Sequence, residues 1–354
     1  MPPRNQKKSS AKMQPEMDFV KVLGKGSFGS VNLFRYPKPD GSMFYNAVKI
    51  SDVQRYDSLD REFRILKKLR GCPRIVQCFG DYLFEDFNCH GNRVYKMVME
   101  YASAGTLTSY MERNRRLSDS IIKNFTRMIL QGLVSIHSLG YVHCDLKPDN
   151  LLLFPRYDEE TWNCSYDLKI SDFGMSTRAR ERSRYWRINC PFVGTPIYMS
   201  PESVHDGTVE KALDLWSLGC IVLEMYIGKQ PWSEVDSNDL EYNLVDNIAP
   251  EIPNTVPCDA RKFLETCFAS TPKDRGTASE LLLHPFLTGE ERKPLLLKMK
   301  ISPKKMTDIS ERPMKLETIP MNPPQFKKIA IKPLKLKVKI LPWRTPASNL
   351  VPVQ

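Results

Sequence analysis

The chain has 354 residues, of which 41% are hydrophobic and 26% charged, a composition typical of a soluble globular protein whose core fills one large domain or two smaller ones. It has no uncharged apolar run of the roughly 18 residues that a membrane span needs and no apolar leader, so we expect it in the cytoplasm, the nucleus or both. Of its net charge of +11, residues 288–354 carry +10, with 15 Lys and Arg against 5 Asp and Glu, so charge gives no reason to expect a nucleic-acid-binding main domain.

Residues 1–17 are polar and are expected to form a flexible tail, which short strands follow. The segments FVKVLGKGSFGSVNLF and MFYNAVKI, separated by the turn sequence YPKPDGS, predict strands joined by tight turns. In the next segment, DSLDREFRILKKLRG, hydrophobic residues recur at helical intervals, at Leu59, Phe63, Leu66 and Leu69. Two further strand-like runs, RIVQCFGDYLF and RVYKMVMEY, complete a small β-rich region over residues 18–101.

The pattern becomes mainly helical over residues 102–287. The segments SDSIIKNFTRMILQGLVSIHSLG, DLWSLGCIVLEMYIG and CDARKFLETCF predict helices, and NLLLF and DLKI predict two short strands around a polar insert. Ordered sequence is expected to end near Leu287. Residues 288–354 are rich in Pro and Lys without a sustained apolar period, which predicts a largely disordered tail. The nine cysteines, an odd number without C-x-x-C spacing, are expected to be free thiols.

The first motif with chemical meaning is GKGSFGSV, a G-x-G-x-x-G-x-V pattern formed by Gly24, Gly26 and Gly29. Glycines there let the backbone approach phosphate oxygens closely. A dinucleotide-binding turn would need a helix inside the motif and an acidic residue about 20 positions on, whereas here a strand follows and Lys49 lies at that position. A lone lysine at a strand end is usually a solvated charge, but a lysine that follows a glycine loop of this kind is expected to contact the α and β phosphates of a nucleotide. Glu62, in the next helix, either forms an ion pair with Lys49 or is an ordinary surface glutamate.

The most informative stretch is YVHCDLKPDNLLL followed by LKISDFGMS. It supplies the charged groups that phosphoryl transfer requires within about thirty residues. Asp145 would orient the attacking hydroxyl as catalytic base, and Lys147 would neutralise the phosphoryl group in transfer. Asn150 and Asp172 would hold magnesium. Two unrelated acidic loops would not explain why H-x-D-x-K-x-x-N and DFG occur in this order and spacing.

By these residues the chain resembles the eukaryotic protein kinases. The resemblance implies an α+β fold with two lobes, a small β-rich N-lobe (18–101) and a larger helical C-lobe (102–287), with ATP bound between them and Mg²⁺ as the metal. It implies that the nucleotide contacts Leu23, Gly24, Lys25, Gly26, Ser27, Phe28, Gly29, Val31, Ala47, Lys49, Glu62, Met99, Glu100 and Ala102. Thr195 together with Lys147 is similar to the pattern of serine/threonine kinases. Structural roles are implied for Asp214 and for a pair between Glu202 and Arg275.

One departure from the family pattern is Cys144, at a position where many kinases have an arginine that receives an activation-loop phosphate. Activity is therefore expected to depend less on phosphorylation of this loop. GKGSFGSVNLF, MEYASAGTL and HCDLKPDNLLL together are most similar to the mitogen-activated protein kinase kinase kinases of plants. This resemblance implies that the protein substrates are downstream kinase kinases.

The basic tail contains Lys327 and Lys328 followed by KPLKLKVKIL, whose apolar residues alternate along an extended strand. Residues 327–340 resemble a docking peptide read by an acidic patch and an apolar groove. A nuclear-import cluster, a membrane-surface contact and a strand packed on the domain remain alternatives.

For the whole protein, the alternative to an active kinase is a scaffold with a kinase fold. Such proteins usually lack the residue that corresponds to Lys49, Asp145 or Asp172, and all three are present here. A nucleic-acid binder would need stacking aromatics in the tail, which has only Phe326 and Trp343.

Overall fold

The computed structural model describes residues 17–26, 29–38, 41–157, 164–186, 194–205, 207 and 209–289. The predicted tails therefore lie almost entirely outside the described residues, as do Ser27, Phe28 and the predicted docking segment 327–340.

The N-terminal lobe is built on an antiparallel sheet of five strands in the order β1-β2-β3-β5-β4. Its strands are β1 (Asp18–Gly26), β2 (Gly29–Pro37), β3 (Met43–Asp52), β4 (Cys78–Phe87) and β5 (Arg93–Glu100). In β3, Ala47 and Lys49 point to one face and Asn46 and Val48 to the other, because side chains alternate along a strand. The strands predicted over the first two segments are confirmed here. The turns predicted between them include residues 27–28 and 39–40, which lie outside the described residues.

The helix α1 (Tyr56–Lys68) follows a short 3₁₀ turn (Val53–Arg55) and packs against β4 and β5. It forms because one side is apolar and the other charged, so that the expected Leu59, Phe63 and Leu66 are buried. Glu62 is also buried on this side, although its neighbours Asp60 and Arg64 form an ion pair at the surface. The buried glutamate therefore requires a partner from the sheet.

One strand is shorter than predicted. The run RIVQCFGDYLF suggests a strand from Arg74, but β4 begins at Cys78. The backbone before it bonds to the second lobe instead, with Val76 N–H donating to the Ile170 carbonyl at 3.0 Å and Ile170 N–H donating to the Arg74 carbonyl at 2.9 Å. Ile75 is fully buried there. Ile75 is apolar because it packs between the lobes. The alternation of apolar and polar residues along the sequence cannot distinguish such a residue from one in a strand.

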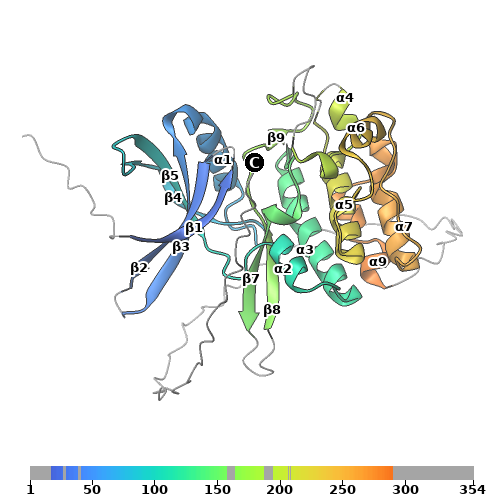
Figure 1. Cartoon of the computed structure of the whole chain (residues 1–354), viewed down its shortest axis with the longest axis horizontal. Coiled ribbons are helices and arrows are strands. Elements are labelled where there is room, and N and C mark those ends of the chain that lie inside the picture. Colours follow the sequence, from blue (N-terminus) through green and yellow to red (C-terminus); the bar gives the residue numbers. More distant parts are fainter. Residues whose placement is uncertain are drawn as a thin grey trace, which may run out of the picture. The chain divides into compact units, whose positions relative to one another are not determined.

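The C-terminal lobe is mainly helical, and in Figure 1 its helices lie on the side of the described domain away from the sheet. The helices are α2 (Leu107–Arg113), α3 (Asp119–Ser138), α4 (Glu202–His205), α5 (Ala212–Ile227), α6 (Ser237–Val245), α7 (Cys258–Cys267), α8 (Ala278–Leu281) and α9 (Pro285–Thr288). Short 3₁₀ turns add Pro148–Asn150, Pro196–Tyr198 and Pro272–Arg275. Two small antiparallel ribbons pair β6 (Tyr141–Val142) with β9 (Thr177–Arg178) and β7 (Leu151–Tyr157) with β8 (Cys164–Ile170).

The long helices are packed at the centre of this lobe. In α5, 14 of 16 residues are buried, because a helix that is apolar all round must be enclosed, and it ends at Gly228 with φ of +70°. In α3, Gly132 allows close packing on β8, since a Cβ at this position would lie 2.7 Å from Ile170 Cδ1. One continuous hydrophobic core runs from α1 through Ile75 and Phe173 to α3 and α5. The two lobes are thus joined by shared core as well as by chain.

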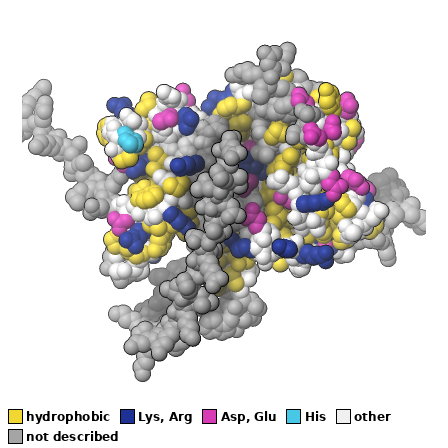
Figure 2. All heavy atoms as spheres, in the orientation of Figure 1, with side chains coloured by type: hydrophobic (Ala, Val, Ile, Leu, Met, Phe, Trp, Pro, Cys, Tyr) yellow, Lys and Arg dark blue, Asp and Glu magenta, His cyan; other side chains and the backbone are white. Residues whose placement is uncertain are grey.

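Among the described residues, no helix is long and apolar enough to span a membrane. The eight cysteines in the described ranges are all free thiols, as expected, and Cys190 lies outside those ranges. Figure 2 shows acidic and basic side chains interspersed over the N-terminal lobe at the left, whereas acidic side chains gather at the upper right and basic ones along the lower edge of the C-terminal lobe.

A buried ion pair fixes the end of the segment that follows the DFG motif. Arg275 is fully buried and donates to both carboxylate oxygens of Glu202, at 2.6 and 2.9 Å, as the resemblance implied. The Arg275 guanidinium also donates to the Ala269 carbonyl at 2.9 Å and lies over the Trp216 ring at 4.9 Å. It therefore ties the start of α4 to α5 and to the loop after α7.

We expect Arg275→Met to lower the free energy of unfolding by about 3 to 5 kcal/mol, because it leaves the Glu202 carboxylate and the Ala269 carbonyl without their buried donor. Urea denaturation of the purified protein measures this change. Arg64→Met is the matched control, since Arg64 is exposed in a surface ion pair and its loss should change stability by less than about 1 kcal/mol. Equal effects of the two variants would contradict the assigned role of Arg275.

Candidate active site

The two lobes meet at the side chain of Lys49, which lies on β3 and is buried. Its ammonium group lies 2.7 Å from Glu62 Oε2 on α1 and 2.9 Å from Asp172 Oδ1 in the C-terminal lobe. The ion pair between Lys49 and Glu62 is therefore present, and Glu62 is not a surface glutamate. Asp172 is the contact that sequence spacing did not predict, because its partner is 123 residues away.

These contacts determine the charge states of Lys49 and Asp172. Burial disfavours the charged form of Lys49, but the negative charges of Glu62 and Asp172 and their hydrogen bonds outweigh it and raise the Lys49 pKa. Burial also acts on Asp172, yet the nearby ammonium group leaves the Asp172 pKa below its usual value. Lys49 is thus a fixed cation and Asp172 a fixed anion at neutral pH.

The described glycines of the motif lie where β1 pairs with β2, with Gly24 opposite Val31 and Gly26 opposite Gly29. Gly29 has φ of +130°, and a Cβ there would come 2.1 Å from the Ile50 carbonyl oxygen, so packing within the sheet requires glycine. Gly24 and Gly26 are different, because a Cβ on either would meet no atom of the described residues within 4 Å. Packing within the described fold therefore does not require glycine at these two positions.

The remaining residues predicted to contact a nucleotide lie along the same lobe. Val31 pairs with Lys49 across β2 and β3, and Ala47 pairs with Met99 on β5. Leu23 and Lys25 are exposed on β1. The chain leaves β5 at Glu100, whose carboxylate bonds to Lys169 at 2.7 and 2.8 Å, and continues through the buried Ala102. Val31, Ala47 and Met99 lie on the side of the sheet that carries Lys49. Lys25 lies on the other side, because it pairs with Ser30, which pairs with Ile50. Glu100 and Ala102 belong to the segment that leads into the second lobe.

The Asp145 carboxylate is held by three side chains of the C-terminal lobe. Thr195 Oγ1 donates to Asp145 Oδ1 at 3.0 Å, and Lys147 Nζ lies 3.0 Å from Asp145 Oδ2. Lys147 also donates to Thr195 Oγ1 at 2.7 Å. Asn150 Nδ2 donates to Asp145 Oδ2 at 3.2 Å and to the Asp145 backbone carbonyl at 2.7 Å. The carboxylate is oriented but not fully enclosed, so it can accept a hydrogen bond from an incoming hydroxyl group.

Backbone bonds to one buried carboxylate hold the loop that carries Asp145. Asp214, at the start of α5, accepts from His143 N–H at 2.9 Å and from Cys144 N–H at 3.1 Å. His137 Nε2 contacts Asp214 Oδ2 at 2.8 Å, and burial notwithstanding, these partners keep the Asp214 pKa low. Cys144 has φ of +68°, a strained conformation for a residue with a Cβ. The anchor on Asp214 offsets this strain.

The DFG segment is fixed to the same loop. Asp172 has φ of +61°, Phe173 is fully buried, and its ring packs edge-on against His143 with centroids 5.1 Å apart. His143 also contacts the Ser171 carbonyl through Nε2 at 2.9 Å. Sequence reasoning did not assign a role to His143, although it belongs to the H-x-D-x-K-x-x-N motif. Its role is to hold Asp145 and Asp172 in a fixed relation.

The oxygen donors fit a small divalent cation. Asn150 turns its amide nitrogen to Asp145, which leaves its side-chain oxygen as the acceptor, and Asp172 engages Lys49 through Oδ1. No cluster of three or more His, Cys, Asp or Glu exists within the described ranges. A magnesium ion needs no such cluster, since it binds to one or two protein oxygens together with substrate phosphates and water.

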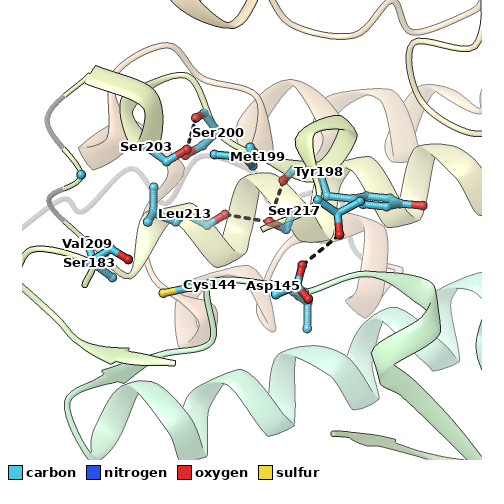
Figure 3. A pocket seen from close by; sticks show the side chains of 13 residues that line it. Cys144, Asp145, Ser183, Tyr198, Met199, Ser200, Ser203, Val209, Leu213 and Ser217 are labelled. Carbon is cyan, nitrogen blue, oxygen red and sulfur yellow. Dashed lines mark hydrogen bonds between the residues drawn. The ribbon is translucent and has the colours of Figure 1, made fainter. Parts of the chain in front are cut away.

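A cavity of 30 Å³ lies behind Asp145, and Figure 3 shows Cys144 turning its sulfur away from the Asp145 carboxylate. Burial, with the negative charge of Asp214 as a smaller cause, raises the pKa of the Cys144 thiol well above its usual value. The thiol is therefore neutral and unreactive. Ser200 Oγ lines this cavity, is buried and has no partner within the described residues. The space suffices for a single water molecule.

Most of the chain matches a known family. Residues 17–287 match the family model described as "Protein kinase domain". The chain is 34% identical to mitogen-activated protein kinase kinase kinase 20 of Arabidopsis thaliana, covering 77% of this chain and 79% of that protein. It is 33% identical to mitogen-activated protein kinase kinase kinase 17 of the same plant, covering 81% and 74%. It is 36% identical to the serine/threonine-protein kinase BCK1/SLK1/SSP31 of Saccharomyces cerevisiae, covering 80% and 19%.

These matches agree with the two-lobed α+β fold and with the geometry around Lys49 and Asp145. The expected fold class and enzyme class are confirmed. The chain belongs to the protein kinase family, as a serine/threonine protein kinase that uses ATP and is related to the mitogen-activated protein kinase kinase kinases.

Proposed function

We propose that this kinase acts at the third tier of a mitogen-activated protein kinase cascade and phosphorylates serine or threonine hydroxyls of mitogen-activated protein kinase kinases. The names of its plant relatives support this tier. The observation that carries the catalytic part is the complete set of charged groups, with Lys49 held between Glu62 and Asp172 and with Asp145 held by Lys147 and Thr195.

In this proposal each group acts on one part of the reaction. Lys49 binds the α and β phosphates, and the backbone at Gly24 and Gly26 covers the phosphates. Asp145 orients the substrate hydroxyl and accepts its proton, and Lys147 offsets the negative charge on the phosphoryl group in transfer. Asn150 and Asp172 would hold Mg²⁺, which neutralises phosphate charge when bound. The adenine base would lie against Val31, Ala47 and Met99 and bond to the backbone of Glu100 and Ala102.

The same proposal covers the remaining predictions. Leu23, Lys25, Ser27 and Phe28 are proposed to complete the ATP site, although Ser27 and Phe28 lie outside the described residues. The domain boundaries at residues 18, 101 and 287 stay predictions. We propose a cytoplasmic or nuclear location, which fluorescence of a tagged chain in cells tests directly. A nucleic-acid partner is not part of the proposal.

We expect Glu62→Gln to lower kcat/KM for ATP by roughly ten- to a hundredfold, because glutamine keeps the shape of the side chain but removes one of the two charges that position Lys49. Asp57→Asn is the control, since Asp57 is exposed in the first turn of the same helix. Steady-state kinetics with a generic protein substrate measure both. Wild-type kinetics in Glu62→Gln would show that the buried pair does not support ATP use.

The proposed substrate tier is tested with Asp145→Asn, which should reduce kcat by at least about a thousandfold while ATP still binds, because the hydrogen-bonding shape remains and the base is lost. Wild-type and variant chains are incubated with labelled ATP and kinase-dead members of each cascade tier. Asp81→Asn, an exposed carboxylate on β4, should match wild type. Labelling of kinase kinases by wild type alone supports the proposal. Labelling of other tiers alone would move the chain to a different place in the cascade.

We also propose that residues 327–340 dock the partner kinase. Deleting residues 325–345 should then weaken binding to the kinase kinase at least about tenfold, since a basic and apolar peptide loses both its charge and its apolar contacts. Binding is measured by calorimetry, with activity on a generic peptide as the control that the kinase domain is intact. Unchanged affinity would remove the docking role.

A further inference from the structure

The segment that follows the DFG motif is well anchored without any added phosphate. Its residues 180–183 pair with the backbone of residues 207 and 209, through Arg180 N–H to the Val209 carbonyl at 2.7 Å and Ser183 N–H to the Gly207 carbonyl at 2.8 Å. Trp186 continues this contact, because its indole N–H donates to the Val204 carbonyl at 3.4 Å. The segment is thus fixed to the C-terminal lobe up to residue 186.

Tyr185 connects this segment to the site. Its hydroxyl group donates to the carbonyl of Gly174, the glycine of DFG, at 3.1 Å. The same oxygen accepts from Arg61 Nη1 on α1, also at 3.1 Å. Arg61 directly precedes Glu62, and Gly174 lies two residues after Asp172. One half-buried hydroxyl group therefore touches the neighbours of both carboxylates that hold Lys49.

In this chain no arginine precedes Asp145 to bind a phosphate on the segment, and the segment's own hydroxyl groups at three positions are buried. The residue before Asp145 is a half-buried cysteine, whose thiol carries no positive charge with which to bind a phosphate. The segment's hydroxyl groups at Ser176, Thr177 and Ser183 are buried, and Ser176 Oγ donates to the His143 carbonyl at 3.1 Å. Replacing these three by alanine would therefore remove packing and hydrogen bonds, and it would not report on phosphorylation alone.

We propose that Tyr185 is a positioning residue whose hydroxyl group, bonded to Arg61 and Gly174, holds α1 and the DFG segment in the arrangement that places Glu62 and Asp172 on Lys49. This inference rests on the proposed kinase activity. Tyr185 does not contact ATP or the substrate in this account and acts only through the helix and the loop. The neutral hydroxyl group takes the place that a phosphate and its arginine receptor have in a charge-based switch.

Loss of the Tyr185 hydroxyl group should lower the fraction of molecules in which Glu62 and Asp172 both contact Lys49. Without the hydroxyl group, α1 and DFG lose a shared partner, and the fraction of molecules with Lys49 correctly held decreases. The apparent affinity for ATP falls by that fraction, and the loss of two hydrogen bonds makes a decrease of about five- to thirtyfold reasonable. Contacts for the protein substrate are not part of this network, so its KM should stay within about twofold.

The test compares Tyr185→Phe, Arg61→Met and the double variant, because phenylalanine keeps the ring packing and removes only the hydroxyl group. The matched controls are Tyr242→Phe, an exposed tyrosine of α6, and Arg64→Met, an exposed arginine of α1. Each protein is treated with phosphatase, checked by mass spectrometry for absence of phosphate, and assayed for kcat and for KM of ATP and of a generic protein substrate. Thermal melting is recorded for each protein.

We expect the dephosphorylated wild type and both controls to be active, and Tyr185→Phe and Arg61→Met each to lose about five- to thirtyfold in kcat/KM for ATP. The double variant should be no worse than the worse single variant, because both remove one network. Three outcomes would each overturn the inference. The first is full activity of Tyr185→Phe, and the second is a loss of kcat/KM in the double variant that equals the two single losses added as free energies. The third is a lower melting temperature without any change in the kinetics. A wild type inactive both before and after phosphatase treatment would instead contradict the kinase activity, and one inactivated by phosphatase would show that phosphate is required.

Discussion

The arrangement of the site depends on how one buried ammonium group is neutralised. Lys49 comes from the sheet, Glu62 from α1 and Asp172 from the C-terminal lobe, so three separate parts of the fold must meet within 3 Å for this cation to be stable inside the protein. Burial alone would drive the lysine toward its neutral form, and the paired carboxylates reverse this effect. The lobes are thus coupled by electrostatics at the same point where phosphates are proposed to bind.

A second constraint is the backbone strain on either side of this point. Cys144 and Asp172 both have positive φ, an uncommon conformation for residues with a Cβ. Asp214 holds the first through two backbone N–H groups, and the buried Phe173 ring against His143 holds the second. The strain is tolerated because buried groups over-determine both positions. Stability of the C-terminal lobe is therefore a precondition of the geometry around Asp145.

Much of this was predictable from the sequence, because glycine spacing, the H-x-D-x-K-x-x-N motif and helical periodicity each point to one local structure. Prediction from the sequence fails where the partner that explains a residue lies far away along the chain. The apolar run around Ile75 predicts a strand, but Ile75 packs between the lobes and β4 begins only at Cys78. The sequence leaves the role of Glu62 open, and its burial against Lys49 decides it. The contacts of His143 and Tyr185 were not predicted, because their partners lie 11 to 124 residues away and no local pattern encodes them.

These contacts explain how the segment after DFG is held although a cysteine and not an arginine precedes Asp145. An arginine in that place would add a buried cation that needs a phosphate or a carboxylate partner, whereas Cys144 is a small neutral residue beside Asp214 and requires none. The segment after DFG then has to be held by neutral groups. The backbone ladder to residues 207–209, the indole of Trp186 and the hydroxyl of Tyr185 are all of this kind. In the described structure the Lys49 ammonium group has both of its carboxylate partners in place without any added phosphate.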